Sequence, residues 1–312
     1  MSSAEPQTTS RVIMIRPASF TSNPETAASN SFQAGLGDQD PQAVREQARR
    51  EFDNLVEALR AAEVEVAVFE DEPEPCTPDA LFPNNWLTTH ADGTVVMYPM
   101  QAPSRQRERR PDILDRLEAE AYHIEHRIDL GPEELRERYL EGTGSLVLDR
   151  ENRVAYACLS PRTDSGLLGE WCERFGYEAH LFRAAMHGQE IYHTNVMMWL
   201  GSKLAGVCLD AVPDPEEREA LREALASQGR QIVEISADQM ASFAGNMLEL
   251  RSSTGRPVLA LSEQALSCLD EAQLGVLREQ AVLAAADIAT IEKYAGGSVR
   301  CMLAENFLPR TD

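Results

Sequence analysis

The stretch "GSLVLDRENRVAYACLSPRTDSGLLGEWCERFGYEAHLFR", Gly144–Arg183, contains one complete unit of the pattern that decides the fold. Its first part, "GSLVLDRENRVAYACLS", predicts a β-hairpin. The next part, "DSGLLGEWCERFG", has the periodicity of a helix, and "YEAHLFR" predicts a third strand. The stretch therefore predicts a small module of hairpin, helix and strand.

The same order recurs along the chain. An earlier unit begins at Phe82 with a hairpin that turns at Asp92–Gly93, followed by the helix "RRPDILDRLEAEA" and the strand "YHIEHRI". A later unit is "NVMMWLGSKLAGVCL", "DPEEREALREALASQG" and "RQIVEIS". Another is "NMLELRSSTGRPVLALS", "EQALSCLDEAQLGVLREQA" and "VLAAADI". A repeat of about 50 to 60 residues indicates an architecture built from similar supersecondary units.

The two ends of the chain can complete a fifth unit. The last strand-like run, "VRCMLAENF", has no partner after it, whereas the N-terminal run "RVIMIRP" is followed by a helix and a strand. Pairing the two ends would close the chain and protect the sheet edges. We therefore predict an α/β fold, a five-bladed pseudo-symmetric ββαβ propeller. An open α/β sheet with antiparallel edges is the alternative.

Composition limits the classes of partner. The chain has 51 acidic and 29 basic residues, a net charge of −22, and no basic block, so nucleic acid and anionic membranes would repel it. The N-terminus lacks the pattern of a secretory signal, and we expect a cytoplasmic protein. We predict a flexible N-terminus at residues 1–10 and a single catalytic domain over residues 11–312, and leave a homodimer open.

The cysteines and histidines do not indicate a metal site. The six cysteines contain no C-x-x-C pair, which predicts free thiols in a chain of 312 residues. His123 and His126 are three residues apart in a predicted strand, so they point to opposite faces. We therefore expect no bound metal. The glycines of "GTGS" lack the remainder of a phosphate-binding loop.

Polar residues of catalytic types stand at the starts of the predicted hairpins. They are Asn84 and Asn85 in "FPNNW", Glu141 in "EGTGS", His193 in "YHTN", Asn246 in "AGNM" and Cys301 in "VRCM". Equivalent positions of units that surround a common axis converge on that axis. Five distant segments are therefore expected to build one pocket.

Cys301 and His193 have the residue types of a nucleophile and its proton carrier. Most free cysteines are buried structural residues, but Gly296–Gly297 before Cys301 allow a ligand to approach closely. Arg300 directly precedes Cys301. In a strand, however, its side chain would point to the face opposite that of the Cys301 thiol, so its charge would lie away from the sulfur. His187, in the loop "AAMHGQE", is the alternative histidine.

These motifs, in this order, resemble the guanidino-modifying superfamily of pentein enzymes, which includes arginine deiminases, dimethylarginine dimethylaminohydrolases and amidinotransferases. The likeness covers nearly the whole chain. "EGTGSLVL" is similar to the acidic glycine motif, "YHTN" to the histidine motif and "GGSVRCML" to the cysteine motif. "YPMQAPSRQRERR" and "LSPRTD" look like the segments that supply two carboxylate-binding arginines. The segments "MIRPASF", "FPNNW" and "GNMLEL" most resemble the citrulline-utilisation hydrolases.

The resemblance implies a propeller with an axial active site and no cofactor. Cys301 would attack the central carbon of a small substrate's guanidino or ureido head, and His193 would protonate the departing amine and then activate water. Glu141 would orient the head group. The substrate-binding residues implied are Asn84, Asn85, Arg105, Arg162, Asn195 and Asn246.

The substrate preference follows from a departure from the relatives. Several of them carry an aspartate where this chain has Asn84–Asn85, and some have one where it has Asn195. Neutral amides remove a preference for a cation, which favours citrulline, giving ornithine, over arginine or methylarginine. A second carboxylate from Asp79, Asp149 or Asp164 would reverse this argument.

Two other functions use the same residues. An amidinotransferase would form the same intermediate and pass it to an amine, and a binding protein would retain the fold without turnover. The polar segment Ser19–Gln33 is either a linker or a lid over the pocket.

Overall fold

A computed structural model of the chain describes residues 5–311. Within this range, five three-stranded sheets share one strand order. In each, the middle strand pairs antiparallel with one neighbour and parallel with the other. The sheets are β17-β1-β2, β3-β4-β5, β6-β7-β8, β11-β12-β13 and β14-β15-β16, and β9-β10 is a separate hairpin.

The strands carry the predicted apolar runs. They are β1 (Arg11–Arg16), β2 (Glu65–Glu70), β3 (Leu87–Thr89), β4 (Thr94–Met97), β5 (His126–Asp129), β6 (Val147–Asp149), β7 (Val154–Cys158), β8 (Glu178–Phe182), β9 (Ala185–Met186), β10 (Gln189–Glu190), β11 (Met198–Leu200), β12 (Leu204–Val207), β13 (Gln231–Glu234), β14 (Leu248–Arg251), β15 (Pro257–Ser262), β16 (Val282–Ala286) and β17 (Ala304–Glu305).

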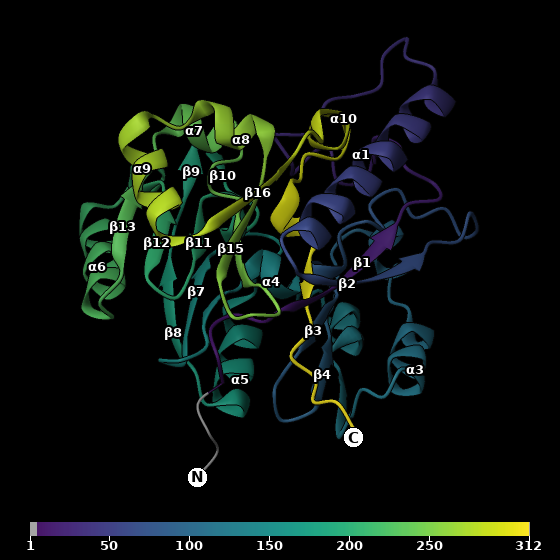
Figure 1. Cartoon of the computed structure of the whole chain (residues 1–312), viewed down its shortest axis with the longest axis horizontal. Helices are drawn as coiled ribbons and strands as arrows, with labels where there is room; N and C mark the ends of the chain where they lie inside the picture. The colour runs from purple at the N-terminus through teal and green to yellow at the C-terminus, as the bar shows by residue number, and fades with distance from the viewer. Residues whose placement is uncertain (1–4, 312) are drawn as a thin grey trace.

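Helices connect the parallel strands, and short helical turns precede the hairpins. The α-helices are α1 (Pro41–Ala61), α2 (Pro103–Gln106), α3 (Pro111–Ala119), α4 (Gly142–Ser145), α5 (Ser165–Phe175), α6 (Pro215–Ser227), α7 (Ala237–Ala241), α8 (Glu263–Cys268), α9 (Glu271–Gln280) and α10 (Ala289–Ala295). The 3-10 turns are η1 (Pro83–Asn85), η2 (Gly131–Arg136), η3 (Thr194–Val196), η4 (Leu209–Ala211) and η5 (Val299–Met302). In Figure 1, α1, α3, α6 and α9 lie at the periphery, and α4 lies near the centre.

Local sequence explains where the connecting helices begin and end. The side chain of Asp164 accepts a hydrogen bond from Leu167 N and so caps the start of α5, which ends at Gly176 in the left-handed conformation. Asp40 caps α1 in the same way, with Pro41 in its first turn. Each connecting helix buries one apolar face, and this anchors it on its sheet.

The predicted closure of the chain ends is confirmed. Strand β17 pairs antiparallel with β1, with Val12 opposite Glu305 and Ile13 opposite Ala304. Strand β17 also lies against β3, and β11 contacts both β6 and β14. The turns in front of these strands meet as well, because α4 contacts η1 and η3, and η1 contacts η5. These turns carry the predicted catalytic residues.

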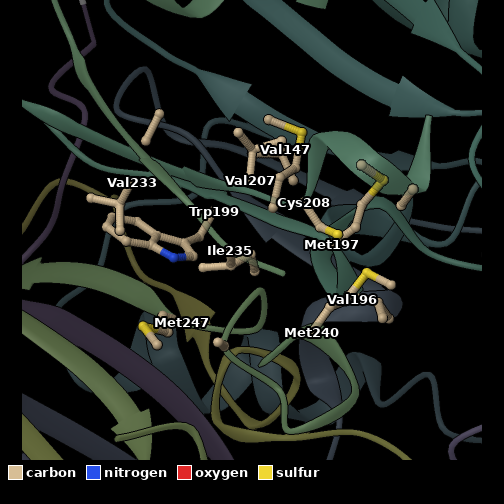
Figure 2. Packing of buried hydrophobic residues seen from close by; sticks show 14 of the residues in the cluster. Val147, Val196, Met197, Trp199, Val207, Cys208, Val233, Ile235, Met240 and Met247 are labelled. Atoms are coloured by element: carbon tan, nitrogen blue, oxygen red, sulfur yellow. The ribbon is translucent and has the colours of Figure 1, made fainter. Parts of the chain in front are cut away.

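The largest apolar cluster supports the sheet β11-β12-β13. It includes Met197, Trp199, Val233, Met240 and Met247, which Figure 2 shows among their neighbours. A Cβ atom on Gly206 would lie 2.0 Å from Nε1 of Trp199, so only glycine leaves room for that ring. Within residues 5–311, none of the helices combines the length and apolar character needed to cross a bilayer.

Three sequence predictions need correction. Cys301 lies in the 3-10 turn η5, ahead of the strand rather than within it. The helix predicted over 263–281 is divided into α8 and α9, because Asp270 forms a capping box that starts a new helix. The expected flexible N-terminus does not hold for residues 5–9, since Gln7 donates to Leu148 O at 2.9 Å and Thr9 to Asn306 O at 2.8 Å. Residues 1–4 lie outside the described range.

Candidate active site

A small cavity lies where the turns meet, and it brings together residues from distant parts of the chain. Its volume is about 20 Å³, which is room for about one water molecule. Its walls are formed by Thr26, Asn30, Asp79, Phe82, Asn85, Arg105, Arg162, Tyr192, His193, Ala295, Gly296, Gly297 and Cys301. Five of the nine predicted site residues are therefore on its wall.

Glu141 lies behind His193 and is bonded to it. Its Oε2 atom is 2.8 Å from Nε2 of His193, and its Oε1 atom accepts a hydrogen bond from Gln101 N at 2.9 Å. Both side chains are buried, at 0% and 2% exposed for Glu141 and His193. A carboxylate in this position fixes the ring orientation of the imidazole and stabilises its protonated form.

The charges around this pair determine its protonation. Burial alone raises the pKa of Glu141, but the charge of Arg162 and the bond with His193 outweigh burial and bring the pKa down to about 2. Burial lowers the pKa of His193 to about 4, and Glu141 only partly offsets this loss of solvation. At neutral pH, His193 is thus a neutral imidazole that donates from Nε2 to an ionised Glu141.

Gly144 in α4 allows the imidazole to sit close to the main chain. A Cβ atom there would lie 2.7 Å from Nδ1 of His193 and 2.4 Å from Nδ2 of Asn85. Both distances are shorter than any contact a real Cβ makes. The glycine motif "GTGS" therefore gives space to the catalytic side chains.

Cys301 presents its sulfur to two asparagine side chains. The Nδ2 atom of Asn246 is 3.4 Å from Sγ, and that of Asn195 is 3.7 Å away. We predicted both residues as substrate ligands, but they are not on the cavity wall. Arg300 donates to Leu303 O at 2.8 Å and to Glu305 at 2.9 Å, so its guanidinium is engaged elsewhere.

Arg105 is on the cavity wall, but its guanidinium is already paired. It bonds Glu108 through Nε and NH2, each at 3.0 Å, and Asn85 Oδ1 through NH1 at 2.9 Å. Burial raises the pKa of Glu108 to about 8, against the lowering effect of Arg105. To bind a substrate carboxylate, Arg105 would have to exchange one of these partners.

Arg162 is more available. Its NH2 group donates to Ser29 Oγ at 2.6 Å, and its NH1 group lies 3.6 Å from Glu141. Among residues 5–311, its buried Nε group has no hydrogen-bond partner. The guanidinium also lies over the ring of Tyr192, 4.7 Å from the centroid.

The two asparagines of "FPNNW" have different surroundings. Asn84 is not among the residues of the cavity wall, and its Nδ2 group donates to Thr143 Oγ1 at 3.3 Å. Asn85 is on the wall, and since its Oδ1 atom accepts from Arg105, its Nδ2 group points the other way. That buried N–H group has no partner within the described part of the chain.

Asp79 places a carboxylate on the cavity wall itself, in addition to that of Glu141 behind His193. Its Oδ2 atom accepts from Asn23 Nδ2 at 2.8 Å, and its Oδ1 atom has no hydrogen-bond partner in residues 5–311. Burial raises the pKa of Asp79, although Arg105 at 3.9 Å acts in the opposite direction. The sequence pointed to Asp79 only as one of three acids, and nothing local distinguished it from Asp149 or Asp164.

The segment Ser19–Gln33, which we call the strap, covers the cavity. Asn30 donates to the main-chain oxygens of Ala295 and Gly296, both at 3.2 Å. The ring of Phe32 packs on Tyr192 and Phe243 at 6.4 and 5.5 Å between centroids. A second pocket of about 330 Å³ is lined by strap residues, including Ser29, and by Tyr192.

The remaining histidines do not join the site. His187 lies in the exposed turn between β9 and β10, so it does not compete with His193. His90 is buried against Phe175 with ring centroids 4.9 Å apart. Within residues 5–311, no group of three His, Cys, Asp or Glu side chains is arranged to hold a metal ion.

A comparison with protein families identifies a matching family model. The family model described as N,N dimethylarginine dimethylhydrolase, eukaryotic, matches residues 16–308. No curated protein matches the sequence.

Several solved structures have a similar fold. Apo ArgZ, an arginine dihydrolase from the ornithine-ammonia cycle in cyanobacteria, superposes with a TM-score of 0.73 at 17% identity, covering 96% of this chain and 41% of ArgZ. The chain thus spans less than half of full-length ArgZ. The ArgZ N-terminal domain with a Cys-to-Ser change, bound to substrate, gives 0.72 at 16% identity, covering 95% of this chain and 97% of that domain. A dimethylarginine dimethylaminohydrolase adduct with S-methyl-L-thiocitrulline gives 0.63 at 15% identity, covering 95% and 99%.

Proposed function

The chain belongs to the N,N dimethylarginine dimethylhydrolase family, eukaryotic, and from this premise we propose that it hydrolyses the guanidino group of a small amino acid through a covalent bond to Cys301. Family membership makes it a hydrolase of guanidino C–N bonds. The observation that carries the proposed chemistry is the meeting of Cys301 and the His193–Glu141 pair at one small cavity. A thiol, an imidazole and an orienting carboxylate are the parts that nucleophilic catalysis requires.

The proposed first step forms the covalent intermediate. The sulfur of Cys301 attacks the central guanidino carbon while neutral His193 takes the thiol proton. His193 then passes this proton to the departing nitrogen, the C–N bond breaks, and ammonia or an alkylamine leaves. The substrate remains attached to sulfur as a thiouronium.

The second step releases the product. Water attacks the same carbon and gives a proton to His193, which Glu141 stabilises as a cation. The C–S bond breaks, the second proton of the water is lost from the new oxygen to bulk solvent, and a neutral ureido amino acid leaves. The proton on His193 returns to the sulfur of Cys301, so the site is restored without a cofactor.

The charge of the cavity favours a cationic head group. Asp79 offers a buried oxygen atom with no partner in residues 5–311, and ionised Glu141 lies behind the imidazole. A planar guanidinium can donate to such oxygens. We therefore propose arginine or a methylated arginine as the first substrate, with Arg162 Nε as a donor to its carboxylate.

One observation favours a second substrate, citrulline, with ornithine as product. Asn85 has a buried N–H group on the cavity wall that is without a partner in the described chain. A donor in this position suits the oxygen of a ureido head, which a guanidinium lacks. ArgZ, whose fold is similar, is an arginine dihydrolase.

The architecture we propose is a five-bladed propeller. The shared strand order of five sheets, the closure by β17 and β1, and the contacts between their leading turns support it. We retain residues 11–312 as one catalytic domain in a cytoplasmic enzyme. The strap would act as the lid, since an amino acid cannot fit in a cavity of about 20 Å³ unless the strap moves.

Product analysis tests the proposal. The protein would be incubated with arginine, monomethylarginine, asymmetric dimethylarginine and citrulline, and citrulline, ornithine, ammonia and methylamines would be quantified. We expect ammonia or methylamine with citrulline from a guanidino substrate, and ornithine in addition if the second substrate is accepted. A mass increase on Cys301 should be detectable in the parent protein when turnover is stopped with acid, and His193→Gln should form neither this adduct nor product. Turnover by Cys301→Ser, or no turnover of any of the four, would refute the proposal.

A further inference from the structure

We propose that Asn195 and Asn246 form an amide cradle for Cys301, in which their side-chain N–H groups hold the sulfur and stabilise its thiolate. The inference rests on the proposed function, because it takes Cys301 as the nucleophile. It makes the two asparagines positioning residues rather than substrate ligands.

The distances identify the cradle. Sγ of Cys301 lies 3.4 Å from Nδ2 of Asn246 and 3.7 Å from Nδ2 of Asn195. The side-chain oxygens of the same residues are farther from the sulfur, at 3.6 and 4.0 Å. Asn195 and Asn246 are each 1% exposed, so water does not compete for these contacts.

The amide of Asn246 has a fixed orientation. One N–H of its Nδ2 group donates to the main-chain oxygen of Asn195 at 2.7 Å, which identifies the nitrogen end of the amide. The second N–H is then directed to the sulfur. The main-chain oxygen of Asn246 accepts from Arg300 N at 3.4 Å, so the residue is also tied to the turn that carries Cys301.

The charged groups near Cys301 have other partners. Arg300, its neighbour in η5, bonds Leu303 O and Glu305. Across the cavity, Nε2 of His193 is bonded to Glu141 and the fork of Arg105 to Glu108. Arg162, Asp79 and the phenol of Tyr192 face the same cavity from other elements. Within residues 5–311, the sulfur's side-chain hydrogen-bond partners are the two asparagines.

Neutral donors suit this position. A thiolate is commonly stabilised by a nearby cation, but a cation beside Cys301 would repel a guanidinium substrate. Hydrogen bonds to the charged form of a group favour that form without adding net charge. The cradle therefore stabilises the sulfur as its proton passes to His193, without adding another cation to a cavity that already has Arg105 and Arg162 on its wall.

Alkylation of Cys301 by iodoacetamide tests the cradle without a substrate. A Cys76→Ser background removes the exposed thiol, and peptide mass spectrometry follows Cys301 at pH 7 and pH 10. Asn195→Ala is the sharpest variant, because the side-chain hydrogen bonds of Asn195 within the described chain all involve this sulfur. We expect its alkylation rate to fall about tenfold at pH 7 and to stay within twofold of the parent rate at pH 10, a pH at which an ordinary cysteine thiol is already ionised.

Two more variants and a control complete the design. Asn195→Asp preserves the shape of the side chain but places a carboxylate at the sulfur, so Cys301 should be alkylated more slowly in this variant than in Asn195→Ala at pH 7. The alkylation rates of Asn246→Ala should resemble those of Asn195→Ala. The control is Asn306→Ala, a buried asparagine whose side chain accepts from Leu308 N and does not contact the sulfur; it should match the parent protein.

The results separate the cradle from a structural role and from the proposed function. A loosened fold would raise the alkylation rate of Cys301 at both pH values. Unchanged rates at pH 7 in Asn195→Ala and Asn195→Asp would overturn the cradle. A decrease in rate of the same size at pH 7 and pH 10 would overturn it as well. Because alkylation needs no substrate, the cradle can be upheld even if none of the guanidino compounds is turned over.

Discussion

Nε2 of His193 and Oε2 of Glu141 lie 2.8 Å apart, although 52 residues separate them in sequence. The two residues come from the starts of successive repeat units, η3 and α4, and these turns contact each other. The repeat thus places an acid and a base in contact that no local motif would bring together. The bond also directs Nδ1 of the imidazole toward Gly144, away from the carboxylate.

Replacing Glu141 by glutamine should reduce turnover strongly. The amide preserves shape but removes the charge that stabilises protonated His193 during proton transfer. We expect kcat to fall by at least about 100-fold, the low end of general acid–base contributions, with a smaller change in KM. Steady-state kinetics on the best substrate measure this. Glu178→Gln, at an exposed position of β8, should keep parental kcat, and an equal loss there would contradict the assignment.

The same pair should make the protein sensitive to acid. The pKa of His193 is lowered to about 4 in the folded protein, so between about pH 6.5 and 4 the unfolded chain binds the proton more readily. Stability is therefore lost as pH falls through this range. The carboxyl of Glu141, with a pKa of about 2, adds a further loss below about pH 4.5.

Urea unfolding of His193→Gln at pH 7 and pH 4.5 checks this sign. The variant should lose less unfolding free energy between the two pH values than the parent protein, whatever its stability at pH 7. His123→Gln, at an exposed position, should show the parental loss. Parallel losses in all three proteins would mean that His193 is not the group responsible.

Gly144→Ala should impair catalysis through a clash. The new methyl group would lie 2.7 Å from Nδ1 of His193 and 2.4 Å from Nδ2 of Asn85, so both side chains must move. We expect a loss of about 1–3 kcal/mol in unfolding free energy and a drop in kcat of about 100-fold. Gly169→Ala in α5 is the matched control, because its Cβ would meet no atom within 4 Å. It should retain activity and gain up to about 1 kcal/mol.

Much of the fold could be predicted from the sequence because each repeat unit repeats a hydrophobic period. The α/β class, the strand order and the pairing of the two chain ends follow from those periods, and the structure confirms them. The position of Cys301 in a 3-10 turn was missed. Since the run "VRCMLAENF" is mostly apolar and contains no glycine or proline, it gives no sign that its first residues turn toward the site rather than extend.

The candidate site was less predictable where long-range packing decides a role. Arg105 carries no sequence sign that Glu108 and Asn85 occupy its guanidinium. Asn195 and Asn246 were identified as site residues, but only their distances from the sulfur show what they contact. Asp79 lies in the loop between β2 and η1, and this loop brings its side chain to the cavity. Hydrophobic periodicity does not predict the course of such a loop.

Replacing Glu292 by glutamine should stabilise the protein at alkaline pH. Glu292 lies in α10, 2% exposed, and its Oε1 atom accepts from Ser298 Oγ at 2.6 Å. Burial raises its pKa to about 7, which the Ser298 bond only partly offsets, so the folded protein holds this proton more tightly than the unfolded chain. Stability is therefore lost as pH rises from about 4.5 through 7, where the buried carboxyl must ionise.

Glutamine stays neutral and can still accept from Ser298, whose main-chain oxygen in turn accepts from Cys301 N at 3.0 Å. Relative to the parent, Glu292→Gln should gain about 1–3 kcal/mol in unfolding free energy between pH 5 and pH 8, as measured by urea titration. Glu279→Gln, at an exposed position of α9, should show no such gain, and a pH-independent difference for Glu292→Gln would exclude titration of this carboxyl as the cause.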